Sequence, residues 1–170
     1  SLMEEAAQLA ASCLLRYYRP GAPLPAQDHL RDKGRNNPLT RADLEADQLL
    51  RQTLLGGRPG YGWLSEETVD SPERLSCQRV WIVDSMDGTK EFILGLPEFA
   101  ISIGLVENGR PVAACVHNPA TRELFSATLG GGTRRNGQPV KVSRQAHLQG
   151  ASCLASYSES RHGEWERFKG

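Results

Sequence analysis

Trp81-Ile82-Val83-Asp84-Ser85-Met86-Asp87-Gly88-Thr89 runs from a short apolar segment directly into two aspartates and a glycine. The continuous apolar run at residues 80–83 predicts a buried strand. A second apolar segment, residues 62–65, ends in the same way, at Glu66-Glu67. Strands that enter a core do not normally end in clustered acids, because a buried carboxylate without a partner is very costly. The two acidic strand ends are therefore the first candidates for a functional site.

A divalent cation is one way to stabilise such a cluster. Magnesium prefers oxygen ligands and is usually held by a few carboxylates, with waters and substrate phosphate completing its shell. Asp84 and Asp87 lie three residues apart across a predicted tight turn, close enough to face one ion or to bridge two. The alternative is a surface turn, in which Asp caps its own backbone and Gly supplies a positive φ. Two strands ending in acids favour the metal site.

The residues after the aspartates resemble the start of a helix, at residues 88–92. Free backbone N–H groups at a helix N-terminus attract phosphate. Gly88 would let the backbone approach that phosphate, and Thr89 would add a hydroxyl. Thr89 is alternatively a helix N-cap. Lys90 is either a positive charge near a substrate or, in the interpretation we favour, a solvated helix residue.

Two helices are predicted before this stretch. Apolar residues recur at helical spacing over residues 2–18, and Pro20-Gly21 stops that helix. Residues 20–38 are rich in Pro, Gly, Asn and charge and are predicted to form a loop. Thr40 then begins the second helix, since Thr40-x-x-Asp43 is a capping-box pattern. Gly56-Gly57 ends it.

Strands are predicted after the stretch. Apolar and small residues alternate over residues 99–105, and a turn at residues 107–110 leads into a strand at 111–117. A third strand is predicted at 122–128, and Asn136-Gly137 forms a turn before another at 140–142. Two helices followed by antiparallel strands imply an α+β layered domain. We place it at residues 1–148, with residues 149–170, including a strand from Ala151, as the start of a C-terminal α/β domain.

Composition excludes several classes of protein. The 170 residues carry 20 basic and 20 acidic side chains, which does not favour a nucleic-acid polymer or a membrane surface as partner. No apolar run is long enough to cross a bilayer. The N-terminus is acidic, unlike a secretory signal. The four cysteines lie far apart, so neither a zinc site nor a disulfide framework is indicated, and the cytoplasm is the expected location.

Three blocks of sequence, in this order, resemble the lithium-sensitive, magnesium-dependent phosphatase superfamily typified by inositol monophosphatase. They are Pro38-Leu39-Thr40-Arg41-Ala42-Asp43, then Ser65-Glu66-Glu67, then residues 81–89. The family pattern is Pro-Val-Thr-x-Ala-Asp, then Glu-Glu, then Trp-x-x-Asp-Pro-x-Asp-Gly-Thr. Order and spacing agree over residues 33–143, which makes the signal specific. The resemblance implies the layered αβαβα sandwich of the sugar phosphatases, here mainly its N-terminal half, with two helices packed on the sheet.

The resemblance also implies roles for individual residues. It implies four magnesium ligands, which are the carboxylates of Glu66, Asp84 and Asp87 and the carbonyl of Met86. The complete enzyme would hold two or three magnesium ions. The implied catalytic residues are Thr89, Asp43 and Glu66, with the Thr89 hydroxyl bonded to Asp43 and orienting a metal-bound water. Asp87, Gly88 and Thr89 would hold the phosphate of a small phosphorylated substrate.

Asp-Gly-Thr-Lys-Glu-Phe at residues 87–92 is most similar to the branch that removes the 3′-phosphate from adenosine 3′,5′-bisphosphate. Ser156-x-Ser158-Glu159, followed by Gly163-Glu164-Trp165, points the same way. Inositol or sugar phosphates are the alternative substrates. A non-catalytic module that binds metal or phosphate is a further alternative, and a structural domain with acidic surface turns is another.

The chain departs from the family pattern in places. Ser85 stands where the family usually has proline, and Arg35 where an acidic residue is common. A Trp-Asp-x-Ala motif, whose aspartate would bind the second metal and the substrate, does not follow Ser143. The resemblance therefore implies a fragment, and we expect the isolated chain to associate, for example as a homodimer, and to have little phosphatase activity.

Overall fold

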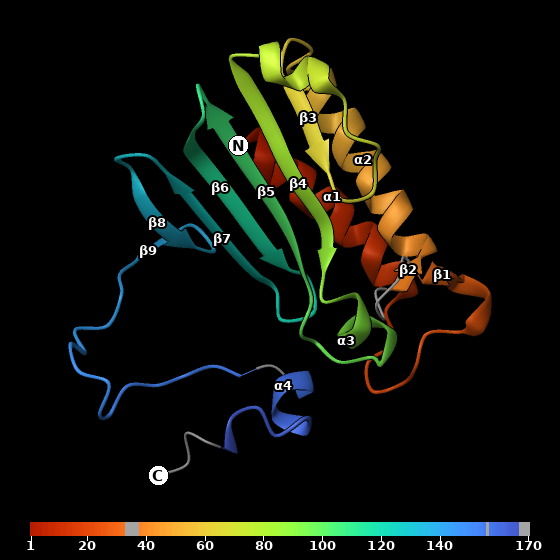
Figure 1. The fold of residues 1–170 in the computed structure, drawn as a ribbon, viewed down its shortest axis with the longest axis vertical. Coiled ribbons are helices and arrows are strands. Elements are labelled where there is room, and N and C mark those ends of the chain that lie inside the picture. Colours follow the sequence, from red (N-terminus) through yellow and green to blue (C-terminus); the bar gives the residue numbers. More distant parts are fainter. Residues whose placement is uncertain (33–37, 156, 167–170) are drawn as a thin grey trace. The chain divides into compact units, whose positions relative to one another are not determined.

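The computed structural model of the chain describes residues 1–32, 38–155 and 157–166 (Figure 1). It divides into two compact units, Ser1–Val140 and the residues from Lys141 onward. The boundary predicted between residues 148 and 149 stays a prediction. The helices of the first unit are α1 (Leu2–Tyr17), α2 (Arg41–Gly57) and α3 (Thr89–Ile93), with 3₁₀ turns at Ala26–Asp28 and Pro72–Ser76. The strands are β1 (His29–Asp32), β2 (Pro38–Thr40), β3 (Gly62–Ser65), β4 (Arg79–Asp87), β5 (Ala100–Glu107), β6 (Arg110–Asn118), β7 (Glu123–Thr128), β8 (Gly132–Arg135) and β9 (Gln138–Val140).

The main sheet follows the order of the chain, from β3 through to β9. The pairs from β4–β5 to β8–β9 are antiparallel. This confirms the direction predicted for these strands other than β8, which was not predicted. β3 and β4, however, pair in parallel, so the prediction of antiparallel strands alone is wrong at this point. The physical reason is the connection, because residues 66–78 with their 3₁₀ turn return the chain to the starting end of the sheet. The predicted α+β class is confirmed.

The core lies between the sheet and the two long helices, which cover one of its faces (Figure 1). α1 and α2 approach each other closely because their facing residues are small, and Ala6, Ala10, Ala42 and Ala46 are fully buried. Both helices begin at capping boxes, at Ser1 and at Thr40, the second of them as predicted. The alternation predicted for β5 is also confirmed, since its inward residues are buried against these helices.

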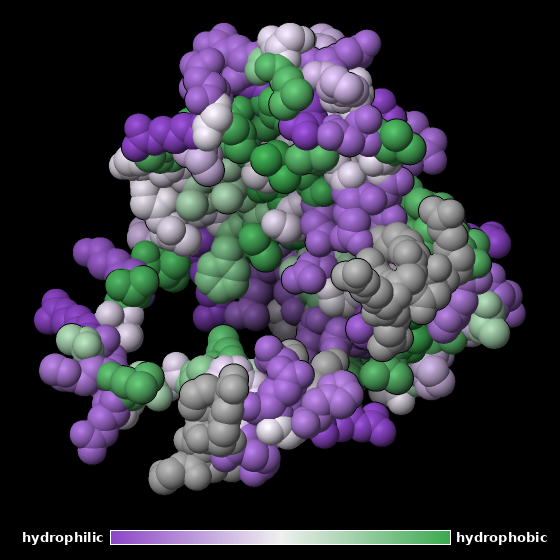
Figure 2. Space-filling model, in the orientation of Figure 1, coloured by the Kyte–Doolittle hydropathy of each residue, from purple (hydrophilic) through white to green (hydrophobic). Residues whose placement is uncertain are grey.

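The other face of the sheet is open in this unit. Ile82, Val116 and Phe125 are 43%, 40% and 37% exposed on strands β4, β6 and β7. Figure 2 shows hydrophobic residues gathered over this part of the sheet. The prediction of a fully buried strand at 80–83 is therefore wrong for Ile82. Trp81 and Val83 alternate with it and are buried, at 3% and 4%, because they face the helices.

Two hairpin turns follow the sequence signals closely. Asn108-Gly109 joins β5 to β6 with φ values of 49° and 76°, and Asn136-Gly137 joins β8 to β9 with 48° and 79°. Such turns need a positive φ at both central residues, which Asn and Gly tolerate. β8 was not predicted, and β9 ends at Val140 rather than continuing to 142.

The loop predicted at residues 20–38 contains more regular structure than expected. β1 and β2 pair as an antiparallel two-stranded sheet, and β2 ends at Thr40, the N-cap of α2. The prediction missed it because β1 and β2 are only four and three residues long and show no clear alternation. Residues 33–37, including Arg35, lie outside the described residues.

The second unit contains α4 (Tyr157–Arg161). The strand predicted from Ala151 is wrong for residues 151–155, which are extended chain without a described strand partner. A strand is stable only when its backbone groups find a neighbour. Ser156 lies outside the described residues. Among the helices that the structure describes, none has both the length and the apolar character needed to span a bilayer.

Candidate functional site

The parallel pairing of β3 and β4 brings the two acidic strand ends to one edge of the sheet. Ser65 pairs with Val83, so Glu66 and Asp84 follow at the same level. Both line a pocket of about 220 Å³ at this edge. The residues that line it are Pro38, Glu66, Asp84, Met86, Asp87, Gly88, Thr89, Lys90 and Glu91. The structure thus brings six of the seven predicted site residues to one pocket, and the seventh, Asp43, contacts it through Thr89.

A β-bulge places both aspartates on the pocket. Along β4, Asp84 pairs with Ser102 and Asp87 pairs with Ala100, so three steps on β4 match two on β5. In a regular strand, residues three apart point to opposite faces. The extra residue of the bulge corrects this, and Ser85 and Met86 are consecutive buried residues as a result. The predicted tight turn between the aspartates is therefore a bulge within a strand.

The carboxylates impose an electrostatic cost on one another. Asp84 is half-buried, and its pKa is raised to about 6, chiefly by burial and then by the nearby charges of Glu66, Asp87 and Glu67. A hydrogen bond from the Met86 backbone N–H to Asp84 Oδ1, at 3.1 Å, acts in the opposite direction. The donor set consists of oxygens, which suits a magnesium ion. In the described part of the chain, no three acidic, His or Cys side chains are already arranged as close as a bound ion would hold them.

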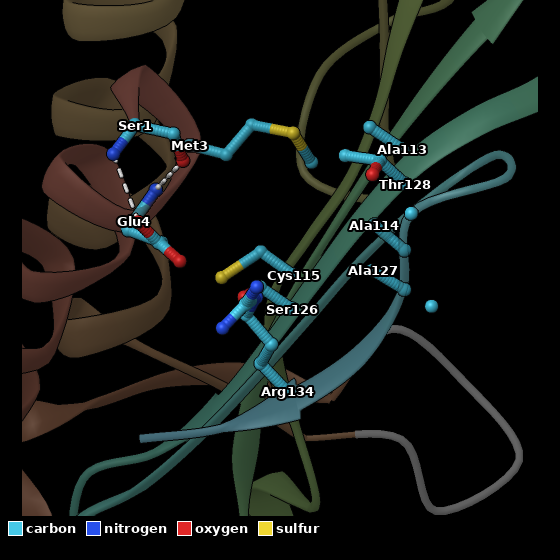
Figure 3. Close-up of a pocket in the computed structure, with 12 residues that line it drawn as sticks. Ser1, Met3, Glu4, Ala113, Ala114, Cys115, Ser126, Ala127, Thr128 and Arg134 are labelled. Atoms are coloured by element: carbon cyan, nitrogen blue, oxygen red, sulfur yellow. Dashed lines mark hydrogen bonds and ion pairs between the residues drawn. The ribbon is translucent and has the colours of Figure 1, made fainter. Parts of the chain in front are cut away.

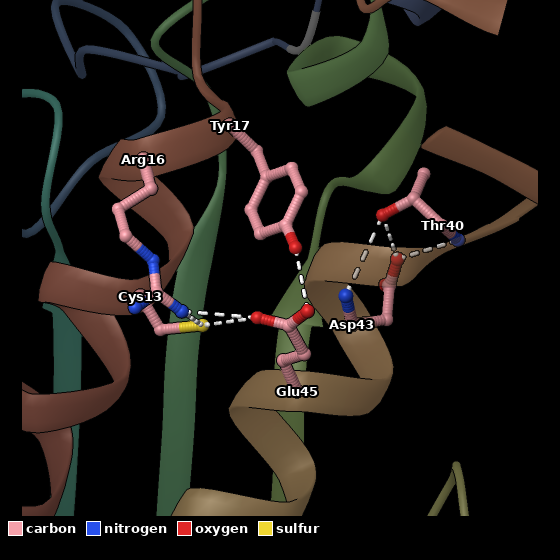
Figure 4. Close-up of polar contacts among 6 residues, drawn as sticks. All are labelled: Cys13, Arg16, Tyr17, Thr40, Asp43 and Glu45. Atoms are coloured by element: carbon pink, nitrogen blue, oxygen red, sulfur yellow. Dashed lines mark hydrogen bonds and ion pairs between the residues drawn. The ribbon is translucent and has the colours of Figure 1, made fainter. Parts of the chain in front are cut away.

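Asp43 connects α2 to the pocket. Its Oδ2 accepts hydrogen bonds from the Thr40 backbone N–H and hydroxyl, at 2.8 and 2.6 Å, and Figure 4 shows this cap. Its Oδ1 accepts one from the Thr89 hydroxyl, at 3.1 Å. The predicted contact between Thr89 and Asp43 is confirmed. Asp43 is 1% exposed, and burial raises its pKa, although the bonds from Thr40 and Thr89 oppose that shift.

Thr89 is not the helix cap, because Gly88 is the N-cap of α3 and Thr89 is the first helical residue. The Met86 carbonyl also lies within hydrogen-bond distance of the Thr89 hydroxyl, at 3.1 Å. Gly88 has a φ of 86°, and a Cβ there would collide with the Glu98 carbonyl oxygen. The glycine is thus required by the fold, whatever it binds. α3 is only five residues long, so its helix dipole adds little to the predicted attraction of phosphate by its N-terminus.

Several residues that contribute to the site were not predicted as site residues. Glu91 is 9% exposed and lines the pocket beside Lys90, which is exposed. Asp47 and Ser65 form a buried hydrogen bond next to Glu66, and the Ser85 hydroxyl donates to the Asp43 carbonyl, at 3.1 Å. The i, i+4 spacing of Asp43 and Asp47 on one helix is the signal that could have identified Asp47.

A second pocket of about 280 Å³ lies between the first turn of α1 and strands β6–β8. Figure 3 shows Cys115 and Arg134 facing that turn. Burial raises the pKa of the Cys115 thiol to about 11, which makes it a poor nucleophile. The acid that lines this pocket, Glu4, is bonded to the Ser1 amino group and to Ser126. Because its lining lacks paired carboxylates, this pocket does not resemble a magnesium site.

A polar cluster joins the exposed sides of α1 and α2 (Figure 4). Glu45 accepts hydrogen bonds from the Tyr17 hydroxyl at 2.6 Å and from Arg16 at 2.9 Å, with the Cys13 thiol beside it. The bond to Glu45 raises the pKa of Tyr17 to about 12. These contacts connect α1 to α2 through polar side chains of both helices.

Comparison with known proteins places this geometry in context. The model of the inositol monophosphatase family matches residues 2–169. The chain is 40% identical to the inositol-1-monophosphatase of Rhizobium meliloti over 119 residues, which are 70% of this chain and 44% of that protein. It is 31% identical to the Nus factor SuhB of Xylella fastidiosa over 159 residues, covering 93% of this chain and 55% of that protein.

Solved structures show the same likeness. The suhB protein of Bartonella henselae superposes with a TM-score of 0.79 at 34% identity, over 86% of this chain and 55% of that one. The IMPase of Thermotoga maritima gives 0.78 at 28% identity, over 96% and 61%. The chain therefore spans about half the length of the relatives it matches. With a family match along nearly its whole length, this chain belongs to the inositol monophosphatase family.

Proposed function

We propose that this chain supplies the first metal site and the water-orienting residues of a magnesium-dependent phosphate monoester hydrolase. The observation that carries the proposal is the 3.1 Å hydrogen bond from Thr89 to Asp43 beside a pocket lined by Glu66, Asp84 and Asp87. That arrangement joins a hydroxyl, a buried acceptor and three carboxylates from three separate segments of the chain, which are the start of α2, the end of β3 and residues 84–89. Family membership supports it, since relatives carry the name of a phosphatase.

The metal would be held by the carboxylates of Glu66, Asp84 and Asp87 and by the Met86 carbonyl. The residues present fit such an ion by their chemistry, because all four are oxygen donors. A cation would also offset the burial and the nearby acidic charges that raise the pKa of Asp84. Bound magnesium ions, two or three in the complete enzyme, supply Lewis-acid activation of water and neutralise the leaving oxygen. The remaining part of the mechanism is carried by the chain's own side chains.

Thr89 orients the attacking water. Its hydroxyl lies 3.1 Å from both Asp43 Oδ1 and the Met86 carbonyl, and its one proton is donated to one of these acceptors. The hydroxyl lone pairs are therefore available to accept a hydrogen bond from water in the pocket. Asp43 is held by Thr40 on its other oxygen and keeps the Thr89 rotamer fixed. Glu66, at the end of the neighbouring strand β3, would accept a proton of that water. Asp87, Gly88 and Thr89 would hold the phosphate.

Two substrate classes have support. Asp-Gly-Thr-Lys-Glu-Phe at residues 87–92 favours the 3′-phosphate of adenosine 3′,5′-bisphosphate, and Lys90 lies on the pocket where it could meet a second phosphate. The relatives named inositol-1-monophosphatase favour inositol monophosphate. A Staphylococcus aureus relative, 26% identical, has been solved with inositol monophosphate and with 2′-AMP. We propose the nucleotide as substrate, with inositol phosphate as the second candidate.

A non-catalytic metal- or phosphate-binding module is the alternative of another class. Relatives named Nus factor SuhB favour it, because that name is not the name of a phosphatase. The isolated chain should bind Mg²⁺ under either proposal. In the catalytic proposal we further expect a small phosphorylated substrate, not a nucleic-acid polymer or a membrane, a cytoplasmic location, and a homodimer when the chain is isolated.

The experiment measures phosphate release from adenosine 3′,5′-bisphosphate, inositol 1-phosphate and 2′-AMP. It compares the isolated chain with the chain joined to the second half that its longer relatives have. We expect magnesium-dependent turnover from the joined protein, abolished by Asp84→Asn, and little from the isolated chain. A folded joined protein that binds Mg²⁺ without releasing phosphate from any ester would contradict the enzyme and favour the binding module.

A further inference from the structure

Helix α2 presents two buried carboxylates toward the acidic edge of the sheet. Asp43 and Asp47 are 1% and 4% exposed and lie one helical turn apart. Asp47 contacts the end of β3, and Asp43 contacts the end of β4. Asp47 Oδ1 accepts a hydrogen bond from the hydroxyl of Ser65, the last residue of β3. The backbone carbonyl of Asp43 accepts one from the hydroxyl of Ser85 in β4, at 3.1 Å.

These two serines flank the predicted metal ligands in sequence. Ser65 directly precedes Glu66, and Ser85 directly follows Asp84. Ser65 pairs with Val83, which is buried on the helix side of the sheet together with Ser85. The hydroxyls of Ser65 and Ser85 therefore both reach α2. The Ser65 oxygen also accepts a hydrogen bond from the Glu67 backbone N–H, at 3.2 Å. The contacts therefore continue from α2 through Ser65 into the Glu66-Glu67 turn.

The dimensions of a helix and a sheet match here. Residues four apart on an α-helix are separated by about 6 Å along its axis. Figure 1 shows α2 running alongside β3 and β4, and Ser85 lies two residues beyond Val83, the partner of Ser65, which is about 6.6 Å along the strand. Positions i and i+4 of the helix can therefore bond to both strand ends, and this is the spacing of Asp43 and Asp47. A rigid helix would then fix the distance between the carboxylates on the two strands.

We propose that α2 sets the spacing of the two acid-bearing strand ends, with Asp47 positioning Glu66 through Ser65, and with Ser85 positioning Asp84 and Asp87 through the Asp43 carbonyl. This rests on the proposed function, because the spacing matters only if the carboxylates share a ligand. Asp47 and Ser65 are positioning residues, since neither lines the pocket.

A purely structural joint would be expected to use apolar contacts, as the rest of the interface between α2 and the sheet does. Burial raises the pKa of Asp47, with the bond from Ser65 and the charge of Arg51 opposing the shift. A carboxylate buried with so few compensating charges is costly to keep. Ser85 fits the same account, because its buried hydroxyl fastens β4 to α2 directly after Asp84.

The test compares Ser65→Ala, Asp47→Ala, Asp47→Asn and the double variant Asp47→Ala/Ser65→Ala in the 170-residue chain. Thr53→Ala is the matched control, because Thr53 lies on the same helix and its hydroxyl donates only locally, to the Leu49 carbonyl at 2.8 Å. Calorimetry gives the Mg²⁺ dissociation constant, thermal unfolding gives the stability, and amide hydrogen exchange of Glu67 in metal-free protein reports the strand end.

We expect Ser65→Ala to weaken Mg²⁺ binding about tenfold, which is the lower end of losses seen for residues that support metal ligands. Asp47→Ala should weaken Mg²⁺ binding by the same factor. The double variant should bind Mg²⁺ no more weakly than either single variant, because each single substitution already removes the same hydrogen bond between Ser65 and Asp47. Asp47→Asn retains the acceptor and should stay within about threefold of the unaltered chain. Glu67 exchange should quicken in Ser65→Ala and not in Thr53→Ala.

Unchanged Mg²⁺ affinity in a folded Ser65→Ala chain would overturn the inference, even if Glu67 exchange quickens, because the contact would then be structural only. If Asp47→Ala does not fold, Ser65→Ala carries the test alone. Failure of the unaltered chain to bind Mg²⁺ would instead contradict the proposed function. If the unaltered chain does not bind Mg²⁺, the Glu67 exchange rate still tests the inference. An unchanged rate in Ser65→Ala would overturn it, and a faster rate would support the positioning of the β3 end by α2.

Discussion

The Thr89 hydroxyl donates a hydrogen bond to Asp43 Oδ1 across 3.1 Å, although 46 residues separate the two in sequence. The contact joins the first turn of α2 to the first residue of α3, two residues after the end of β4. Sequence proximity could not produce it. Thr89 lines the carboxylate pocket and Asp43 is buried behind it, so the bond connects α2 to the site of the proposed chemistry. A single substitution can remove it.

Thr89→Ala should therefore lower kcat more than it raises KM in the protein that contains both halves of the family fold. The hydroxyl acts on the attacking water, not on ground-state binding. Loss of an oriented proton acceptor of this kind typically costs about 100-fold or more. Steady-state kinetics with Thr89→Ala, and with Thr89→Ser as the variant that keeps the hydroxyl, check this. An unchanged kcat would remove Thr89 from the mechanism.

Asp84→Asn should have opposite effects on metal binding and on metal-free stability. Removing a ligand charge should weaken Mg²⁺ binding by at least about tenfold. Without metal at pH 7, the same change should raise the melting temperature, since it removes a half-buried charge that burial and three neighbouring acids disfavour. Calorimetry and thermal unfolding check the two halves of the prediction.

Asp70→Asn is the control for that experiment. Asp70 is an exposed acid bonded to Arg74, so its loss should leave Mg²⁺ binding unchanged and lower stability only slightly. A lower melting temperature of metal-free Asp84→Asn would contradict the prediction, because it would show that Asp84 is not destabilised by burial and by its acidic neighbours.

Gly88→Ala should destabilise the fold more than Gly109→Ala does. Both glycines have a positive φ, 86° and 76°, but a Cβ at position 88 would meet the Glu98 carbonyl and Phe99, and one at 109 meets open space. Positive φ alone costs about 1 kcal/mol for alanine, and the collision should bring the loss at Gly88 to about 2 kcal/mol or more. Denaturant unfolding of both variants measures the difference, and equal losses would show that the collision is relieved without cost.

His117 should make the chain less stable below neutral pH. Burial lowers its pKa from the usual 6.5, while a bond to the Ala7 carbonyl opposes that shift, and its Nδ1 is buried without a described partner. The folded chain thus holds His117 neutral, and the unfolded chain takes up the proton first as pH falls through about 6.5. The stabilisation is present above that pH and is lost below it.

Urea unfolding at pH 7.5 and pH 5.0 checks this for the unaltered chain, for His117→Gln and for His147→Gln, which changes an exposed residue. We expect His117→Gln to lose less stability between the two pH values than either of the others. Equal losses in all three proteins would show that His117 can be protonated without leaving its place.

The elements of this fold and its Asn-Gly hairpins were largely predictable, whereas the parallel direction of the β3–β4 pair was not. Helical spacing, the Thr40 capping box and the Asn-Gly turns specify local structure, because each depends on residues within one turn of each other. Strand direction depends on where the chain returns, and residues 66–78 carry no periodic signal for that. The parallel β3–β4 pair was therefore missed, although it is what unites Glu66 with Asp84.

Within the site, residue types were predictable from motifs but supporting contacts were not. Asp84 and Asp87 were assigned to a turn, since a bulge leaves no mark on a short sequence. Ser65, Ser85 and Asp47 act through hydrogen bonds to distant segments, so only the folded chain shows them. Whether the predicted metal and catalytic residues perform their roles stays a prediction, which the substitutions above test.

The sheet topology also has a consequence for the order in which the chain folds. Strands β5 to β9 pair with their sequence neighbours through short turns, and such local contacts form early. The acidic edge needs α2, β3 and β4 to meet across longer loops, so it should be among the last parts to assemble. A cation that binds only there would leave the folding rate nearly unchanged and would slow unfolding instead.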